Sequence, residues 1–261
     1  GDAAPGPAAV VLVDLTELRR LEGVRRDFVA NVSHELKTPL TSIRGYAETL
    51  LDPELPPATA RQFLETIHRN AARLQRIVDG LLDLSRLESG GWRPELRAVD
   101  VAAAARDAWA ACEERAREKR IRFDAPGPGP HAGADPVALA QVFANLFDNA
   151  LRHTPSGGRI AVELREDAAA GRLVVEVQDT GSGIPTDALA RVFERFYRVD
   201  PARSRAEGGT GLGLAIVKHL IEAMGGDVVA ESVLGHGTTI RFRIPLAARP
   251  ALEPAGPPRP G

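Results

Sequence analysis

Two stretches of the sequence repeat apolar residues every seven positions, which constrains the fold more than any other feature. The first spans residues 28–50, the second spans residues 63–84, and a proline-rich cluster at 52–57 separates them. Heptads of this kind are typical of amphipathic helices that pack along an apolar seam. One helical hairpin buries two seams poorly, so we expect two copies of the chain to form a four-helix bundle. The repeating positions are Val29, Leu36, Ile43 and Leu50 with Val32, Pro39 and Tyr46, then Ile67, Leu74 and Leu81 with Phe63, Asn70, Ile77 and Leu84.

The periodicity changes after Trp92, where short alternating segments predict a mixture of strands and helices. Their order favours an α/β sandwich, so the predicted fold class is α plus α/β, a helical hairpin followed by a sandwich domain. The predicted strands are 95–99, 121–123, 159–164, 173–178, 227–232 and 238–244, and the predicted helices are 101–119, 137–151 and 212–224.

The two ends of the sequence have a different character. An apolar run at 10–13 predicts a strand, and a helical pattern follows it. A lone strand cannot pair its own edges, so residues 1–27 are interpreted as the end of a domain cut off upstream. Residues 249–261 contain five prolines and are expected to be disordered. The domain boundaries predicted between these ends are 28–91 and 92–248.

Composition excludes several classes of function. The chain has 33 basic and 35 acidic residues among 261, so it lacks the positive field of a typical nucleic-acid binder. The single cysteine, Cys112, excludes an internal disulfide and a cysteine-based zinc site. No uncharged apolar run is long enough to span a bilayer, and the first residues do not resemble a signal peptide.

His34 is the first candidate for chemistry, because its heptad position faces away from the predicted seam. Glu35 follows it directly, and Pro39 lies about one turn further along. An exposed imidazole beside a carboxylate can act as a nucleophile, although a lone histidine is more often a plain surface residue. The other histidines, His68, His131, His153, His219 and His236, are interpreted as surface or structural residues.

The string around His34 reads FVANVSHELKTPLTSIRGYAETL and strongly resembles the phospho-accepting helix of sensor histidine kinases. The resemblance implies that His34 accepts a phosphoryl group and that Glu35 acts as the base on its other ring nitrogen. Thr38, four residues after His34, resembles the threonine of kinases that also dephosphorylate their response regulators. Alternatively, Thr38 is a β-branched residue placed before proline for structural reasons.

The segment QVFANLFDNALRHTP places Asn145 and Asn149 on one face of a predicted helix. Amide oxygens suit Mg²⁺, and Arg152 lies within reach of a phosphate, although asparagines on a helix surface need no function. The segment resembles the N-box of the same family, which implies magnesium–nucleotide binding by Asn145 and Asn149 and contacts from Arg152 and His153.

Two glycine-rich segments complete the pattern. DTGSGIP follows a predicted strand, so the carboxylate of Asp179 can accept from an amine, although such a turn is common in any protein. GGTGLGLAIVKHL opens a helix whose free N–H groups suit an anion, and it is neither a Walker loop nor a Rossmann fingerprint. Both resemble glycine boxes of the histidine-kinase ATP-binding fold, with residues 193–209 as a nucleotide lid and 235–239 as the final glycine turn. The implied ATP-binding residues here are Asp179, Gly181, Gly183, Gly209, Thr210, Gly211, Leu212, Gly213, Leu214 and Thr238.

The matched boxes run in order from residue 28 to residue 246, and they imply an ATP-dependent protein-histidine kinase core similar to the phosphate-regulon sensor type. Its expected cofactors are ATP and Mg²⁺, and its expected partners are a second copy of the chain and a response-regulator receiver domain, with no nucleic acid. We expect a cytoplasmic portion of a protein anchored in the inner membrane through segments outside this sequence.

Two alternatives remain. A gyrase-type ATPase shares the nucleotide fold but carries a glutamate where this chain has Asn145, and Asp148 is expected to face another neighbour. The other alternative is a nucleotide-binding pseudokinase scaffold, against which the intact His34, Asn149, Asp179 and glycine run argue.

Overall fold

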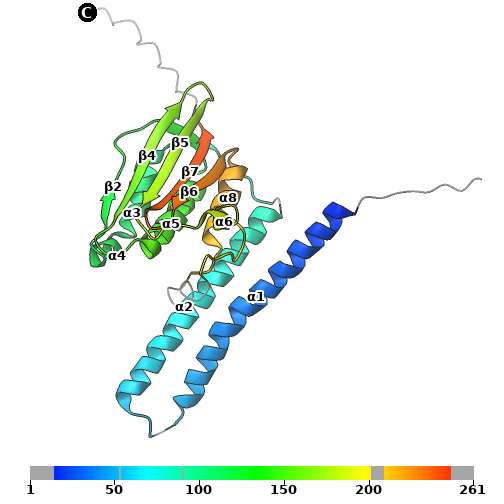
Figure 1. Ribbon diagram of the computed structural model, residues 1–261, viewed down its shortest axis with the longest axis vertical. Helices are drawn as coiled ribbons and strands as arrows, with labels where there is room; N and C mark the ends of the chain where they lie inside the picture. The colour runs from blue at the N-terminus through cyan, green and yellow to red at the C-terminus, as the bar shows by residue number, and fades with distance from the viewer. Residues whose placement is uncertain (1–14, 53, 90, 201–208, 248–261) are drawn as a thin grey trace, which may run out of the picture. The chain divides into compact units, whose positions relative to one another are not determined.

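The computed structural model describes residues 15–52, 54–89, 91–200 and 209–247 (Figure 1). The chain divides into two compact units, residues 1–71 and residues 72–261, so the division falls inside the second helix. The predicted strand at 10–13 and the proline-rich tail lie outside the described residues. Among the residues described, no helix combines the length and the apolar character needed to cross a membrane.

The first unit is built from α1 (Thr16–Thr49) and the beginning of α2 (Pro57–Glu88). α1 continues through the buried Pro39, and α2 starts on Pro57, whose fixed φ suits a first helical position. The rings of Tyr46 and Phe63 meet with centroids 4.8 Å apart. Both residues occupy predicted heptad positions, so the two helices pack through the predicted seam.

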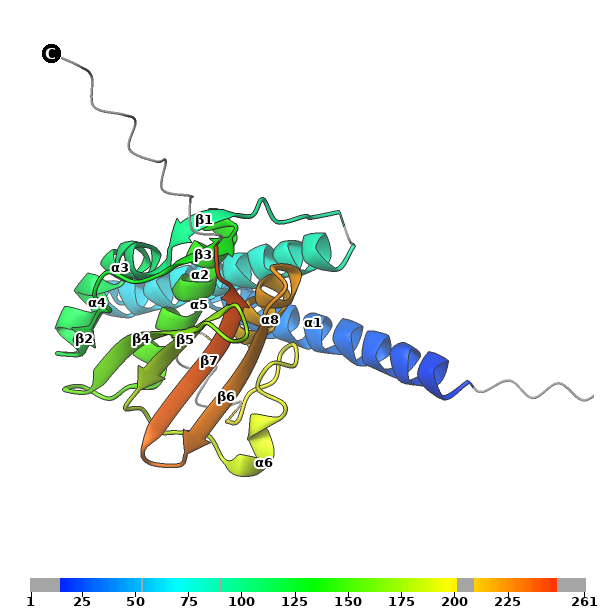
Figure 2. The ribbon, with the colours of Figure 1, turned by 90° about the horizontal axis from the view of Figure 1, so that it is seen from above.

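The second unit contains a five-stranded sheet with strands in the order β2-β4-β5-β7-β6, in which β2 and β4 are parallel and the other pairs are antiparallel. β1 and β3 form a separate antiparallel pair. Figure 2 shows α3, α5 and α8 along one face of the large sheet. The strands are β1 (Arg97–Asp100), β2 (Arg122–Asp124), β3 (His131–Ala134), β4 (Arg159–Asp167), β5 (Arg172–Asp179), β6 (Asp227–Val233) and β7 (Gly237–Pro245), and the helices are α3 (Val101–Ala110), α4 (Glu113–Glu118), α5 (Pro136–His153), α6 (Thr186–Leu189) and α8 (Gly213–Ala223).

The core lies between the sheet and these helices, and aromatic side chains form its centre. Trp109 stacks on Phe123 with centroids 4.0 Å apart, and Phe147 meets both rings edge-on. Phe143 joins this group to Phe242 on β7. Both α5 and β7 are therefore anchored by bulky buried residues, and these are two of the elements that carry predicted site residues.

The structure corrects one predicted helix and adds two elements that the sequence did not predict. The predicted helix 101–119 is two helices, because the N–H of Cys112 bonds to the carbonyl of Trp109 three residues back and ends α3. Since no glycine or proline marks this break, the apolar pattern predicts one helix. The segment before Asp135, for which no strand was predicted, forms β3. Its buried residues are the small Ala132 and Ala134, which give little alternation signal. The short α6 was not predicted.

Candidate functional site

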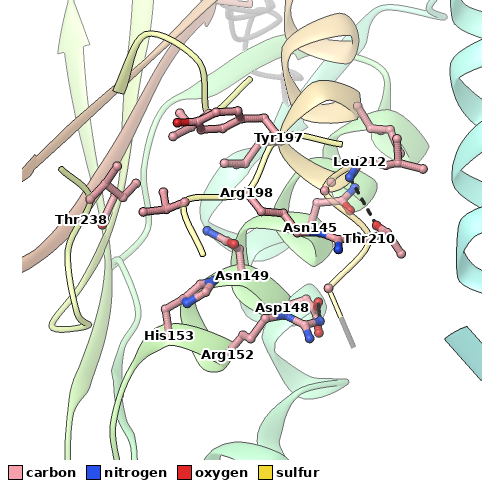
Figure 3. Close-up of a pocket in the computed structure, with 18 of the residues that line it drawn as sticks. Asn145, Asp148, Asn149, Arg152, His153, Tyr197, Arg198, Thr210, Leu212 and Thr238 are labelled. Atoms are coloured by element: carbon pink, nitrogen blue, oxygen red, sulfur yellow. Dashed lines mark hydrogen bonds and ion pairs between the residues drawn. The ribbon is translucent and has the colours of Figure 1, made fainter. Parts of the chain in front are cut away.

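A cavity of about 510 Å³ lies in the second unit, where α5, the loop after β5 and the loop before α8 converge (Figure 3). The C-terminal half of α2, which belongs to the same unit, also contributes residues to its wall. Segments more than sixty residues apart thus share one cavity. Of the residues predicted to bind nucleotide, those lining it are Asn145, Asn149, Arg152, His153, Asp179, Gly183, Gly209, Thr210, Gly211, Leu212, Gly213, Leu214 and Thr238.

Asn145 is oriented by its own helix. Its amide Nδ2 donates to the carbonyl of Gln141 at 2.9 Å, which leaves Oδ1 as the free end of the side chain. A Cβ on Gly213 would lie 3.1 Å from this Oδ1, so the glycine lets the start of α8 approach Asn145 closely. Figure 3 shows Asn149 and His153 following Asn145 along α5. The helix therefore presents a row of polar side chains at the cavity.

Asp148 also lines the cavity, and two arginines hold its carboxylate. Arg152 donates at 2.7 Å from one turn along α5, and Arg115 of α4 lies 2.9 Å away. Burial disfavours the Asp148 anion, but the charges and hydrogen bonds of Arg152 and Arg115 outweigh it and hold the pKa of Asp148 below its usual value. Asp148 is therefore an ion-pair partner of two arginines. This agrees with the expectation that it faces another neighbour.

Lys119, which the sequence analysis did not single out, stabilises the same end of α5. Its Nζ donates to the carbonyl of Leu151 at 2.7 Å and to that of Thr154 at 3.3 Å. A cation at a helix C-terminus satisfies unpaired carbonyls and complements the helix dipole. The side chain is 32 residues from Leu151 in sequence, and no local pattern links the two positions.

Asp179 ends β5 and also lines the cavity. Its carboxylate accepts the Gly181 N–H at 2.7 Å, and the backbone N–H of Thr238 also bonds to it. Desolvation raises the pKa of Asp179 to about 6 despite these two hydrogen bonds. Gly181 is the one predicted nucleotide residue that does not line the cavity, and a Cβ there would meet Asp179 Oδ1 at 2.6 Å. Its contact with the site is therefore the hydrogen bond to Asp179.

The loop before α8 is shaped by glycine. Gly211 has φ +72°, and its carbonyl accepts the N–H of Phe196 at 2.8 Å. A Cβ on Gly211 would lie 2.8 Å from the Phe196 backbone, so the close approach needs glycine at this position. α8 then starts at Gly213 after the apolar cap Leu212, whose N–H bonds to the Thr210 hydroxyl at 3.3 Å. The first turn of α8 thus points N–H groups and the positive end of its dipole at the cavity.

Part of the predicted lid is described. Tyr197 and Arg198 line the cavity across from Asn149 (Figure 3). The guanidinium of Arg191 stacks over the Tyr197 ring at 4.4 Å and also pairs with Glu194. The predicted lid also contains Arg195, which is described, and Arg203 and Arg205, which lie outside the described residues.

The predicted phospho-acceptor residues lie on α1 in the first unit. His34 is exposed and Glu35 is half-buried. The Thr38 hydroxyl donates to the His34 carbonyl at 3.2 Å, one residue before the Glu35 carbonyl that lacks a helical donor because Pro39 has no N–H. His34 therefore faces solvent.

The donor set of the cavity fits magnesium bound through a nucleotide. Among the described residues, no group of three His, Cys, Asp or Glu side chains could hold a metal by itself. Mg²⁺ keeps several waters and prefers phosphate oxygens, so one or two amide oxygens beside a triphosphate suffice. Asn145 Oδ1 and the side chain of Asn149 on the same helix face meet this requirement.

Comparison with known families matches both units. Residues 134–248 match the family of histidine kinase-, DNA gyrase B- and HSP90-like ATPases, and residues 24–90 match the His Kinase A phospho-acceptor domain. The chain is 41% identical over 239 residues to the sensor-like histidine kinase SenX3 of Mycolicibacterium smegmatis, covering 91% of this chain and 62% of that protein. It is 38% identical over 241 residues to the sensor histidine kinase WalK of Bacillus subtilis, covering 90% of this chain and 39% of that protein.

Solved structures agree on the fold. Full-length ShkA in complex with AMPPNP superposes with a TM-score of 0.63 at 32% identity, covering 86% of this chain and 47% of that chain. The histidine kinase ThkA in complex with the response regulator protein TrrA superposes with a TM-score of 0.70 at 23% identity, covering 89% and 65%. The second likeness concerns the fold alone.

Proposed function

Because the chain belongs to the two-component sensor histidine kinases, we propose that it transfers the γ-phosphoryl group of ATP to His34 and then to an aspartate of a response regulator. One observation carries the proposal. A cavity bounded by a helix N-terminus and a desolvated aspartate occurs in the same chain as an exposed histidine on a phospho-acceptor helix. The cavity can hold a nucleotide, and the histidine can accept its phosphoryl group.

At the acceptor, a lone pair on one imidazole nitrogen of His34 attacks the γ-phosphorus, and the bond to the β,γ-bridging oxygen breaks to release ADP. The proton on the other ring nitrogen passes to Glu35, which leaves a neutral phosphorylated imidazole. The exposure of His34 supports this role, because the nucleophile must meet a phosphoryl group brought from another domain. Phosphoryl transfer depends mainly on in-line approach and charge neutralisation.

In the cavity, Asp179 accepts a hydrogen bond from the adenine amine, and the N–H groups before and within the first turn of α8 bind phosphate oxygens. Asn145 and Asn149 would hold Mg²⁺, which would neutralise charge on the triphosphate. Arg152 and His153 lie on the same face of α5 and complete the phosphate side, while Tyr197 and Arg198 border the nucleotide from the lid.

We propose the domain division 28–91 for dimerisation and phosphotransfer and 92–248 for ATP binding. The dimer follows from unpaired apolar side chains on the hairpin, of which Leu40 and Leu64 are 59% and 57% exposed in the single chain. The receiver domain of a response regulator then docks against the hairpin. ThkA, which shares this fold, is solved in complex with such a regulator.

We also propose that Thr38 assists dephosphorylation of the regulator. Since the Thr38 hydroxyl gives its proton to the His34 carbonyl, its oxygen can accept a hydrogen from a water molecule. A water held in this way directs its own lone pair outward, toward an aspartyl phosphate docked beside His34.

The test is labelling with ATP that carries a labelled γ-phosphate. The wild-type chain should acquire an acid-labile, base-stable label, and His34→Gln should abolish it without changing nucleotide affinity. His68→Gln, which removes an exposed histidine from α2, is the matched control and should label normally. Phosphate release without any label on His34 would favour the gyrase-type alternative, and nucleotide binding with neither activity would favour the scaffold.

A further inference from the structure

The hydroxyl of Ser232 on β6 lies at the centre of three hydrogen bonds next to the cavity. It lies 2.9 Å from the Ile184 amide nitrogen, 2.6 Å from the Gly237 carbonyl oxygen and 3.0 Å from the Thr238 hydroxyl. Ile184 belongs to the loop after β5, while Gly237 and Thr238 begin β7. Ser232 does not itself line the cavity, whereas Ile184 and Thr238 do.

The direction of each bond follows from the inventory of one proton and two lone pairs on a hydroxyl. The Ile184 N–H can only donate, so it uses one lone pair of Ser232. Two oxygens 2.6 Å apart need a proton between them, and a carbonyl has none, so Ser232 donates to Gly237. Ser232 then has one lone pair left, and the Thr238 hydroxyl must donate to it.

These bond directions determine whether the Thr238 hydroxyl acts as a donor or an acceptor at the cavity. Its proton points to Ser232, so toward any ligand its oxygen is an acceptor. Asp179 pairs with Thr238 across β5 and β7, and its carboxylate is also an acceptor. This end of the cavity therefore offers two acceptors, which suit the two hydrogens of an exocyclic amine, reached directly or through a shared water.

We propose that Ser232 is a specificity-determining positioning residue, which holds the Thr238 hydroxyl as an acceptor so that the site takes 6-aminopurine and rejects 6-oxopurine nucleotides. This inference rests on the proposed ATP-binding function. A 6-oxo group would place its lone pairs against those of Thr238 and Asp179, and a site built to accept hydrogen bonds discriminates strongly against such a group.

A purely structural role for Ser232 predicts a different result, because other contacts already attach the loop after β5 to the β6–β7 hairpin. The Gly235 N–H donates to the Ser182 carbonyl at 2.7 Å. Gly183 packs so closely that a Cβ there would lie 2.2 Å from the Val233 carbonyl. Loss of the Ser232 hydroxyl should therefore leave the loop in place and free the Thr238 proton.

The experiment measures the dissociation constants of ATP and of its 6-oxo analogue ITP with the whole chain. In Ser232→Ala the ratio of ITP to ATP dissociation constants should fall about tenfold, because the Thr238 hydroxyl can turn its proton toward the 6-oxo group. Ser232→Thr keeps the hydroxyl and should retain the wild-type ratio of ITP to ATP dissociation constants. Thr239→Ala, which removes a neighbouring hydroxyl of β7 that lies outside this cavity, should leave the ratio unchanged.

An equal weakening of both nucleotides in Ser232→Ala would overturn the inference and leave the proposed function standing. Failure of the wild-type chain to bind ATP would overturn both. If the alanine variant does not fold, Ser232→Cys supplies the test, since a thiol is a weak donor and acceptor and should lower the ratio in the same direction.

Discussion

The guanidinium of Arg152 lies 2.7 Å from the carboxylate of Asp148, one turn earlier on α5. The Arg152 side chain is only 11% exposed, while that of Asp148 is 40% exposed and also contacts Arg115. A buried cation is thus neutralised by a carboxylate at the edge of the cavity. The pair lies on the helix that carries Asn145 and Asn149, so it bears on both stability and the site.

Asp148→Asn should lower the free energy of unfolding by about 1 kcal/mol at pH 7, because Arg152 loses its charged partner while it stays buried. Arg117→Gln, which breaks an exposed pair with Glu113, should cost less than about 0.5 kcal/mol. Because the pKa of Asp148 is lowered, its contribution is present above the usual value of 3.8 and is lost only as the pH falls through the lowered value. Urea unfolding should give the same difference in unfolding free energy between wild type and Asp148→Asn at pH 5 and at pH 7. Equal losses of unfolding free energy in Asp148→Asn and Arg117→Gln at pH 7 would contradict the pairing of Asp148 with a buried Arg152.

Asp179 should reduce the stability of the folded chain, and in return it should recognise the adenine base. The pKa of Asp179 is raised to about 6 from the usual 3.8, so the folded state holds this proton more tightly than the unfolded state. The free energy of unfolding should therefore fall as the pH rises from about 4 to 6, and ATP affinity should rise as the carboxylate ionises. Asp179→Asn should be about 1 kcal/mol more stable than wild type at pH 7.5, bind ATP at least tenfold more weakly and lose both pH dependences. Thermal unfolding and nucleotide titration across this pH range test the prediction, which fails if the variant is less stable at pH 7.5.

Gly211 should tolerate no side chain. Gly211→Ala adds a Cβ 2.8 Å from the Phe196 backbone at a residue with φ +72°, so the loop before α8 must move and ATP affinity should fall at least tenfold. Gly157→Ala is the matched control, because φ is +83° there and a Cβ meets nothing within 4 Å. It should cost about 1 kcal/mol of stability and leave ATP affinity intact. Equal affinities for the two variants would show that the close approach at Gly211 does not shape the site.

The proposed dimer is best tested at Leu64. Leu64 is exposed in the single chain, so Leu64→Asp should leave the fold intact and split the dimer by placing a charge in the interface. Leu81 is a poorer choice, because it packs against the core of the second unit. Gln62→Asp places the same charge on an exposed polar position of α2 and serves as the control. Light scattering at micromolar concentration should report a monomer for Leu64→Asp alone, and a monomeric wild type would end the proposal.

Thr38→Ala should leave labelling of His34 nearly unchanged and slow dephosphorylation of the regulator at least tenfold, because the water loses its acceptor. Thr38→Ser keeps the hydroxyl and should retain the rate. The measurement is the decay of phosphorylated regulator with each variant and nucleotide present. Identical decay with Thr38→Ala and wild type would leave Thr38 with its hydrogen bond to the His34 carbonyl as its whole role.

Local patterns in the sequence were sufficient for the helical hairpin, most of the strands and the glycine segments around the cavity. Heptad spacing, alternation and glycine each reflect the conformation of a few neighbouring residues, so they can be interpreted without the fold. The same logic failed at 101–119, where a helix breaks without glycine or proline, and at β3, where two buried alanines carry too little contrast.

Tertiary structure alone decided which groups act on the predicted site residues. Asp148 meets Arg115 from 33 positions earlier, Lys119 caps a helix that ends 34 positions later, and Ser232 reaches Ile184 across 48 positions. The raised pKa of Asp179 is likewise a consequence of its burial in the folded chain. Contacts between residues this far apart in the sequence follow from packing, whose free energy depends on the whole core. The periodicity of the sequence therefore does not predict them.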